Sequence, residues 1–136
     1  MDCIFCKIAA GEIPGYKIYE ADGTLAFLDI APVNPGHVLV IPKKHYKNME
    51  EIPDDELGAV MVAIKKIGRA IKNGLDATGY NINLNNDPIA GQIIPHLHFH
   101  IIPRRAGDGL KLWPQGEYGA GEAEKTAKKI SQFIKL

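Results

Sequence analysis

The sequence lacks the features that mark membrane, secreted or polymer-binding proteins. Lys+Arg and Asp+Glu balance at 16 each in 136 residues, so no overall charge attracts a nucleic-acid polymer or a membrane surface. No apolar run approaches the roughly 20 residues that a membrane span needs. The opening Met-Asp-Cys lacks the basic and apolar regions of a secretory signal. We therefore expect a cytoplasmic protein whose partners include neither a membrane nor a nucleic-acid polymer.

Cysteine is equally scarce, and its placement is informative. The two cysteines, Cys3 and Cys6, have Cys-x-x-Cys spacing. In a cytosolic protein that spacing indicates metal or redox chemistry rather than a structural disulfide. A thioredoxin-type motif follows a strand, and no strand precedes these residues in the sequence, so zinc is favoured. The pair supplies half of a tetrahedral site. The alternative is that both are small buried hydrophobic residues.

Histidine, by contrast, is concentrated. Three of the five histidines fall in His96-Leu97-His98-Phe99-His100-Ile101-Ile102. Strict alternation with large apolar residues predicts a half-buried strand over 96–102. The three histidines then share one face, about 6.6–6.8 Å apart, so that one small polar ligand could contact two imidazoles. The alternative is a solvated strand face without function, but such faces are normally built from Lys, Glu and Thr.

Shorter patterns predict the other elements of a single domain. An 8-residue N-terminal helix over 3–10 ends at Gly11, and a long amphipathic helix runs from about Pro53 to Asn73. Ala123, Ala127, Ile130 and Ile134 mark a final amphipathic helix. Strands are predicted at 17–20, 25–28, 37–42 and 80–85, the last pairing antiparallel with the histidine strand. The predicted fold class is α+β, an antiparallel sheet of about five strands with two principal helices on one face.

A loop over 86–92 joins the last two strands. Asn81, Asn83 and Asn85 alternate with apolar residues and should share one strand face. If the two strands pair as predicted, the amides of Asn85 and Gln92 come close to the imidazoles.

The residues 96–102 resemble the signature of the histidine triad (HIT) superfamily. Further blocks match in order and at family spacing: Cys3-Ile4-Phe5-Cys6-Lys7-Ile8, Gly11-Glu12-Ile13-Pro14, Leu25 to Ile30, Gly36 to His45, and Gly91-Gln92. The resemblance covers residues 3 to 105 and is to the Hint-like, nucleotide-binding branch. It implies one HIT domain over 1–136, with its core at 3–105 and a C-terminal extension and helix at 106–136.

The resemblance implies an enzyme that binds purine nucleotides. Its substrates would be AMP esters, nucleoside phosphoramidates or related compounds, cleaved at the α-phosphate through a covalent nucleotidyl-histidine. His98 matches the nucleophile, His100 contacts the phosphate or the leaving group, and His37 supports the triad. Gln92 and Asn85 match amides that hold the phosphate and the nucleophile. Two alternatives stay open: a dinucleoside polyphosphate hydrolase or phosphorylase, and a low-turnover nucleotide-binding regulatory module.

The same resemblance implies ligand sites and an assembly. Asp29 matches the carboxylate that accepts the ribose hydroxyls. The remaining implied nucleotide-binding positions are Phe27, Leu28, Ile30, Asn85, Gly91, Gln92, His98 and His100. A structural zinc ion (Zn2+) is implied at Cys3, Cys6, His45 and His96, and relatives generally form homodimers.

Two departures from the family pattern stand out. Close relatives carry Ser or Thr after the glutamine, with a hydroxyl for the phosphate, and this chain has Ile93. Some relatives carry a Trp-Pro that reaches the partner's site. Trp113-Pro114 lies farther from the triad and precedes a helix, so that role is not transferred.

Overall fold

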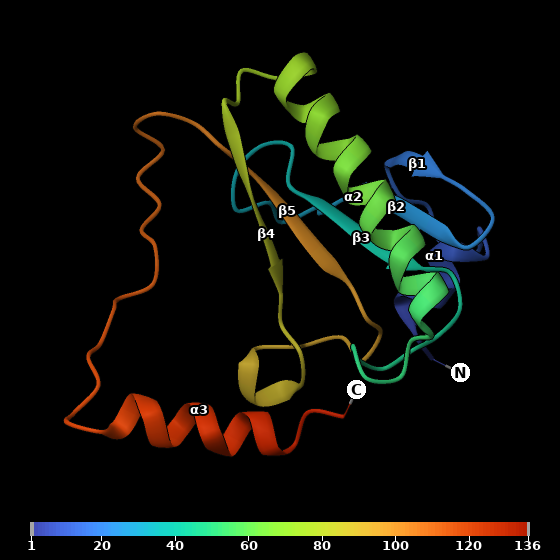
Figure 1. Cartoon of the computed structure of the whole chain (residues 1–136). Helices are drawn as coiled ribbons and strands as arrows, with labels where there is room; N and C mark the ends of the chain where they lie inside the picture. The colour runs from blue at the N-terminus through green and yellow to red at the C-terminus, as the bar shows by residue number, and fades with distance from the viewer. Residues whose placement is uncertain (1, 136) are drawn as a thin grey trace.

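The computed structural model describes residues 2–135 and contains a five-stranded sheet in the order β1-β2-β3-β5-β4 (Figure 1). Every neighbouring pair of strands is antiparallel. The strands are β1 (Lys17–Glu20), β2 (Thr24–Leu28), β3 (Val38–Pro42), β4 (Gly79–Leu84) and β5 (Phe99–Arg104). The predicted α+β class and the sheet are confirmed.

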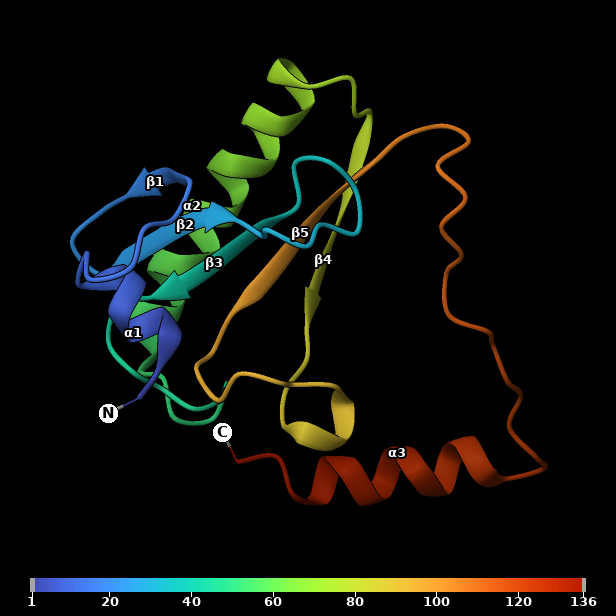
Figure 2. The ribbon, with the colours of Figure 1, turned by 180° about the vertical axis from the view of Figure 1, so that it is seen from behind.

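Helices cover the two faces of the sheet unequally. The long helix α2 (Asp54–Gly74) packs on β2, β3 and β5, whereas the short α1 (Ile4–Ala9) lies on the opposite face (Figure 2). A single 3-10 turn, η1 (Pro88–Ala90), lies in the loop between β4 and β5. Among the described residues, no helix combines the length and apolarity needed to cross a membrane.

The period-2 pattern of the strands divides the core into two layers. Val38 and Val40 pack in the cluster with α2, whereas Leu39 and Ile41 pack in the cluster with α1. In β5 the apolar Phe99 and Ile101 face α2. Because side chains alternate along a strand, the even-numbered histidines are directed to the α1 side.

The strand predicted for the histidines is displaced in the structure. β5 begins at Phe99 rather than His96 and continues to Arg104. Pairing with β3 stops at Phe99, because β3 ends at Pro42, which has no N–H to donate, and the Leu97 N–H instead bonds Tyr46 O at 2.7 Å. The inward and outward alternation nevertheless persists, since Leu97 is fully buried in the α2 cluster.

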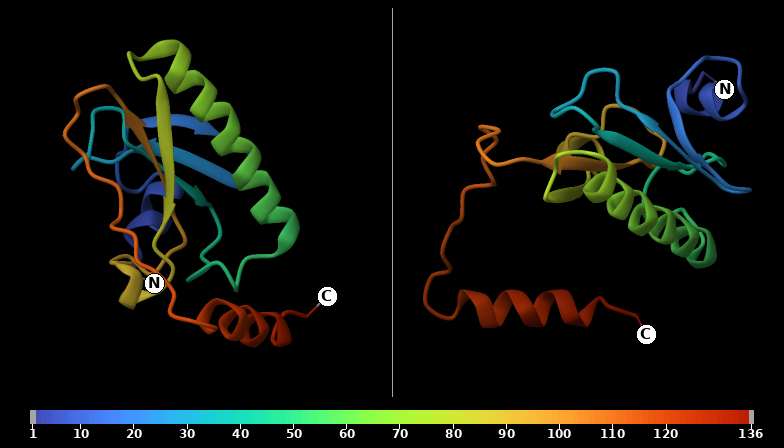
Figure 3. Two further views of the ribbon diagram at one scale, coloured as in Figure 1. Left: turned by 60° about the vertical axis from the view of Figure 1, so that its left-hand side comes forward. Right: turned by 90° about the horizontal axis from the view of Figure 1, so that it is seen from above.

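The second principal helix does not cover the sheet, contrary to the prediction. α3 (Glu122–Gln132) has no buried residue and stands apart from the sheet in both views of Figure 3. An extended segment leads to it from the end of β5. The amphipathic pattern correctly predicted a helix, but it could not specify which surface the helix packs against.

Candidate active site and metal centre

The register of the sheet gathers the polar residues of the site. Leu39 of β3 lies opposite both Phe27 of β2 and His100 of β5. His37 and Asp29, just outside β3 and β2, continue this pairing, and the Asp29 N–H donates to His37 O at 2.9 Å. Residues that are far apart in sequence therefore share the α1 face.

His98 is held in one tautomer. Its Nδ1 lies 2.7 Å from the carbonyl oxygen of His96. A carbonyl only accepts, so Nδ1 carries the proton and Nε2 keeps its lone pair. Burial lowers the pKa of His98, partly opposed by its hydrogen bond to His96 and by the charge of Asp29. The lowered pKa keeps the ring neutral at neutral pH. Neutral imidazole with a free Nε2 is a nucleophile.

His100 is held in the complementary tautomer through His37. The Val33 N–H donates to His37 Nδ1 at 3.1 Å, which places the proton of neutral His37 on Nε2. That Nε2 lies 2.9 Å from His100 Nδ1 and donates to it. The remaining N–H of His100 is thus on Nε2, which is buried and has no hydrogen-bond partner among the described residues.

An unpaired buried donor is costly, and such groups are uncommon outside functional sites. Burial, followed by repulsion from His98 and His37, lowers the pKa of His100 to about 4. Burial also lowers the pKa of His37, against the opposing charge of Asp29. At neutral pH the site therefore offers a lone pair at His98 and an N–H at His100, with 5.0 Å between the ring centroids.

Both rings open into a cleft of about 410 Å³ on the α1 face. Its walls are mostly apolar, and its lining includes Phe27, Leu28, Asp29, Ile30, Asn85, Gly91, His98 and His100. These are the implied nucleotide-binding positions apart from Gln92. A larger groove of about 510 Å³ lies against α2 and contains no histidine. Convergent polar groups in an apolar cleft favour the smaller one as the ligand site.

The structure places Gln92 differently from the other implied residues. Its Oε1 accepts from the Asp87 N–H at 2.8 Å, and its Nε2 donates to Lys47 O at 2.7 Å and to Ile94 O at 3.1 Å. The side chain is buried and is not part of the cleft lining. In this structure Gln92 joins two loops behind the cleft.

Sequence reasoning missed Phe5. Its ring meets His98 edge-on with centroids 5.0 Å apart, and it also contacts Phe27 at 5.5 Å and lines the cleft. The available signal was its place between Cys3 and Cys6. The implied ligands include those two cysteines and His96, which lies two residues before His98.

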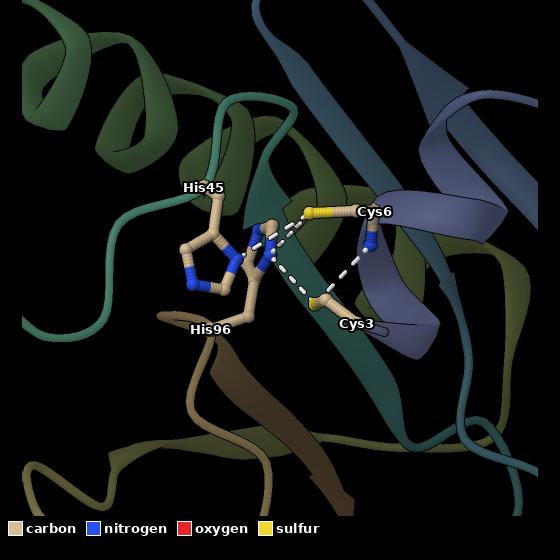
Figure 4. A group of neighbouring side chains, drawn as sticks. All are labelled: Cys3, Cys6, His45 and His96. Carbon is tan, nitrogen blue, oxygen red and sulfur yellow. Dashed lines mark hydrogen bonds between the residues drawn. The ribbon is translucent and has the colours of Figure 1, made fainter. Parts of the chain in front are cut away.

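The predicted zinc ligands converge, as Figure 4 shows. Cys3 Sγ lies 3.4 Å and Cys6 Sγ 3.5 Å from His96 Nδ1, and Cys6 Sγ lies 3.4 Å from His45 Nδ1. Zn–S and Zn–N bonds of about 2.3 and 2.0–2.1 Å in a tetrahedron separate sulfur from nitrogen by about 3.5 Å. The four donor atoms lie within 4.8 Å of one another. The spacing fits a Cys₂His₂ zinc site.

Hydrogen bonds around the four residues also suit a metal. His96 Nε2 lies 2.8 Å from Pro42 O and so carries the proton, leaving the lone pair on Nδ1, which faces the sulfurs. The Cys6 N–H lies 3.4 Å from Cys3 Sγ, at the start of α1. Burial and the neighbouring Cys3 raise the pKa of the Cys6 thiol to about 11. A bound cation reverses that effect, since a coordinating thiol is deprotonated.

A second group, Asp29, His37 and His100, also has donor atoms within 4.8 Å. Its hydrogen bonds do not suit a metal. The Val33 N–H occupies the lone pair of His37 Nδ1, so neutral His37 has a proton, not a lone pair, on the Nε2 that faces the group. The two clusters therefore differ in tautomer. His96 directs a lone pair toward its cluster, as a metal ligand does, whereas neutral His37 directs an N–H toward its cluster.

Comparisons with known proteins identify relatives of the chain. The model of the HIT domain family matches residues 10–107. Adenosine 5'-monophosphoramidase HNT1 of Candida albicans is 44% identical over 138 residues, which span 97% of this chain and 91% of that protein.

Solved structures are similar as well. The crystal structure of a HIT family member from Bacillus subtilis has a TM-score of 0.92 at 39% identity, covering 100% of this chain and 99% of that one. Because the match spans the whole chain, it includes the C-terminal segment. A Zn-bound histidine triad family protein from Mycobacterium smegmatis has a TM-score of 0.78 at 34% identity, covering 97% and 98% of the two chains.

Proposed function

Because this chain belongs to the HIT domain family, we propose that it is a nucleotide hydrolase or transferase that acts at the α-phosphate of AMP derivatives. Nucleoside phosphoramidates are the favoured substrates, since the similar Candida albicans protein is named for that activity. One observation carries the proposal: His98 and His100 hold complementary neutral tautomers at the wall of one apolar cleft.

The first chemical step forms a bond between His98 Nε2 and the α-phosphorus. The bond from phosphorus to the leaving group breaks, its electron pair departs with the leaving group, and water protonates that group. The N–H at His100 Nε2 donates a hydrogen bond to an oxygen of the reacting phosphate, where negative charge builds up. A transient covalent bond divides one difficult hydrolysis into two easier transfers.

The intermediate carries a positive charge on the His98 ring, because Nε2 is bonded to phosphorus while Nδ1 keeps its proton. The carbonyl of His96 accepts that proton's hydrogen bond more strongly from a cation. Asp29 adds a favourable charge interaction, as its effect on the His98 pKa indicates. Water then attacks phosphorus and gives up a proton to the solvent, the electron pair of the P–N bond returns to Nε2, and AMP is released.

Nucleotide binding uses the rest of the cleft. The aromatic rings of Phe5 and Phe27 and the neighbouring aliphatic residues offer an apolar wall for a purine. Asp29 Oδ1 already accepts the Ala31 N–H at 2.9 Å, which fixes the carboxylate while Oδ2 stays available for ribose hydroxyls. Gly91 and Asn85, whose Nδ2 lies 3.4 Å from Gly91 O, line the phosphate end.

We further propose that Cys3, Cys6, His45 and His96 hold a structural zinc ion. All four positions are protein ligands, so the site is closed and zinc supplies stability rather than a reactive water. The spacing of the donors and the Zn-bound family member from Mycobacterium smegmatis support this proposal. We also propose that the protein forms a twofold homodimer, as the family resemblance implies, and that it works in the cytoplasm, as expected from the sequence.

A substrate panel read by mass spectrometry tests the chemistry. Adenosine phosphoramidate, an AMP ester and diadenosine tetraphosphate are supplied separately, the last with and without inorganic phosphate. We expect AMP from the phosphoramidate, with an adenylyl group trapped on the peptide that contains His98. His98→Ala should lose turnover by on the order of 10⁴-fold or more, while keeping its fold and AMP binding.

The outcomes separate the alternatives. Faster cleavage of diadenosine tetraphosphate, with phosphate incorporated into the product, would indicate a phosphorylase. Tight AMP binding without turnover of any substrate would indicate a regulatory module. Wild-type hydrolysis by His98→Ala would exclude His98 as the nucleophile.

A further inference from the structure

The loop between β2 and β3 (residues 30–36) supplies the Val33 N–H on which the tautomers of His37 and His100 depend. The loop is exposed, with 86% of Ile30 and 49% of Val33 accessible to solvent. Segments with few buried apolar contacts open locally at low cost. Side-chain packing therefore does not hold the Val33 N–H at 3.1 Å from His37 Nδ1, and hydrogen bonds must do so.

Asn34 is the one residue of the loop that has a polar side chain. Its Nδ2 donates to Pro103 O at 2.9 Å and to Asp108 Oδ2 at 3.1 Å. Both partners can only accept, so the nitrogen of the amide, and not its oxygen, faces them. Both amide protons are thus used to join the loop to the end of β5 and the turn that follows it (Figure 2).

The acceptor Asp108 is itself fixed in position. Arg104, at the end of β5, donates to its carboxylate at 2.8 and 3.0 Å, and the backbone N–H groups of Arg105 and Leu110 each donate at 3.1 Å. These donors, Arg104 above all, hold the pKa of Asp108 well below its usual range. Asn34 therefore donates to a charged acceptor, which forms stronger hydrogen bonds than a neutral one.

A tight turn connects Asn34 to His37. The His37 N–H donates to Asn34 O at 3.0 Å, which closes the turn over residues 34–37. Pro35 followed by Gly36, with its φ of +92°, suits the two central positions of a type II turn. Fixing Asn34 consequently fixes both the preceding Val33 N–H and the turn that carries the His37 ring.

We propose that Asn34, held by Asp108, is a positioning residue that keeps the Val33 N–H on His37 Nδ1 and so determines which nitrogen of His100 carries a proton. The inference rests on the function proposed above and adds a residue that is not part of the cleft lining. If the loop moves away, His37 can take the other tautomer and accept at Nε2. His100 then presents a lone pair, and not an N–H, to the phosphate.

Two substitutions separate positioning from general destabilisation. Asn34→Asp replaces the donor with a carboxylate of the same shape, which cannot donate to Pro103 O and is repelled by Asp108. Asn81→Ala is the matched control, because Asn81 Oδ1 accepts from Arg104 at 2.8 Å in the same cluster but on the β4 side, away from the loop. Urea unfolding shows that both variants are compared at a temperature where they are folded.

Steady-state kinetics of the full-length, metal-replete protein with adenosine phosphoramidate gives the first test. We expect Asn34→Asp to lower kcat by about 10-fold and to change KM by less than about 3-fold, because a donor worth about 10²–10³ in rate is lost in part of the molecules. The hydrogen bond from Arg105 to Pro35 O remains and limits the movement of the loop. Asn81→Ala should keep the wild-type kcat. Asn34→Ala, which adds no charge, should show a smaller loss than Asn34→Asp.

A double-mutant cycle tests whether Asn34 acts through His37. In a His37→Ala background, Asn34→Asp should cause no further loss of kcat, because the contact that it controls is already absent. The same fold-loss in both backgrounds would overturn the proposal.

Nitrogen-15 NMR of the imidazole rings reports the tautomers directly and needs no turnover. We expect neutral His37 to carry its proton on Nε2 in the wild type and in Asn81→Ala, and to populate both tautomers in Asn34→Asp. A His37 spectrum that Asn34→Asp leaves unchanged would overturn the positioning role, even if adenylyl transfer to His98 is demonstrated. The expected tautomer change in a protein that cleaves no AMP derivative would support the positioning of His37 and overturn only the proposed chemistry.

Discussion

His37 Nε2 lies 2.9 Å from His100 Nδ1, and that contact determines which nitrogen of His100 can meet a substrate. The Val33 N–H fixes the first ring and the first ring fixes the second. A backbone amide therefore sets, through two imidazoles, the position of a proton at the cleft. In our interpretation His37 is a positioning residue that need not touch the phosphate.

Removing that contact should impair turnover more than binding. We expect His37→Ala to lower kcat about 10- to 100-fold with little change in KM, since an unconstrained His100 can turn its lone pair toward the phosphate and lose part of a donor that is worth about 10²–10³ in rate. His37→Gln, whose side-chain amide can donate to His100, should recover part of the loss. Steady-state kinetics of the two variants provides the measurement, and equal rates in both would contradict the relay.

The depressed pKa of His100 predicts how stability depends on pH. An unfolded histidine titrates near its ordinary value of about 6.5, whereas in the folded chain the pKa of His100 falls to about 4. Between these values the unfolded state binds more protons, so stability rises with pH. Each such histidine contributes a slope of at most about 1.4 kcal/mol per pH unit. Urea unfolding of wild type and His100→Asn from pH 4 to 7 should show a shallower slope in the variant.

Much of the sheet could be predicted from sequence, because burial on one face produces the alternation around Phe99 and burial on both faces produces the continuous apolar run from Val38 to Ile41. The start of β5 could not. It depends on Pro42, a residue of another strand that offers no N–H at the end of the pairing. The position of α3 could not be predicted either. An apolar stripe indicates that a helix packs against some surface, but it does not indicate which surface.

The site shows the same division. Motif spacing that matches the family identified residues that the fold brings to one cleft. The directions of their hydrogen bonds, however, depend on backbone atoms whose positions the sequence pattern does not give. The roles of Val33 and Pro42 are carried by the backbone, so their side chains give no signal. Gln92 shows a further limit of the pattern: its residue type matches the family, whereas its side chain is hydrogen-bonded to neighbouring loops in this structure.

Loss of the zinc ion should destabilise the fold more than it weakens nucleotide binding. The proposed ligands tie the start of α1 to the sheet, and α1 in turn carries Phe5 to the cleft. We expect about one zinc per chain, and a fall in Tm of about 10 °C or more for Cys3→Ser or after chelation. AMP affinity measured by calorimetry at a temperature where the variant is folded should fall only a few-fold. Metal-free protein of unchanged Tm would be incompatible with a structural site.

We expect Gln92→Ala to lower the free energy of unfolding more than it impairs turnover. The substitution removes the partners of the Asp87 N–H and of two carbonyls in a buried position, at a cost of about 1–3 kcal/mol. Denaturant unfolding should show this loss, while kcat at a temperature well below Tm should change by less than about 10-fold. A fall in kcat of about 10³-fold with unchanged stability would instead place this amide on the reacting phosphate, as the family resemblance implies.

Substitution of Ile93 provides a test in which the variant is expected to gain activity. This side chain lines the cleft at 91% exposure, at the position where close relatives carry a hydroxyl. Ile93→Ser should cost little stability because the side chain is not packed. A new hydrogen bond to a charged phosphate is worth about 1.5–3 kcal/mol, so kcat/KM for adenosine phosphoramidate should rise by about 10-fold or more. Ile89→Ser, on the same loop at 99% exposure but outside the cleft lining, serves as the matched control and should leave kcat/KM unchanged. If both variants behave as wild type, the phosphate does not approach Ile93, and the donors for its charge must come from His100 and the loop at Gly91.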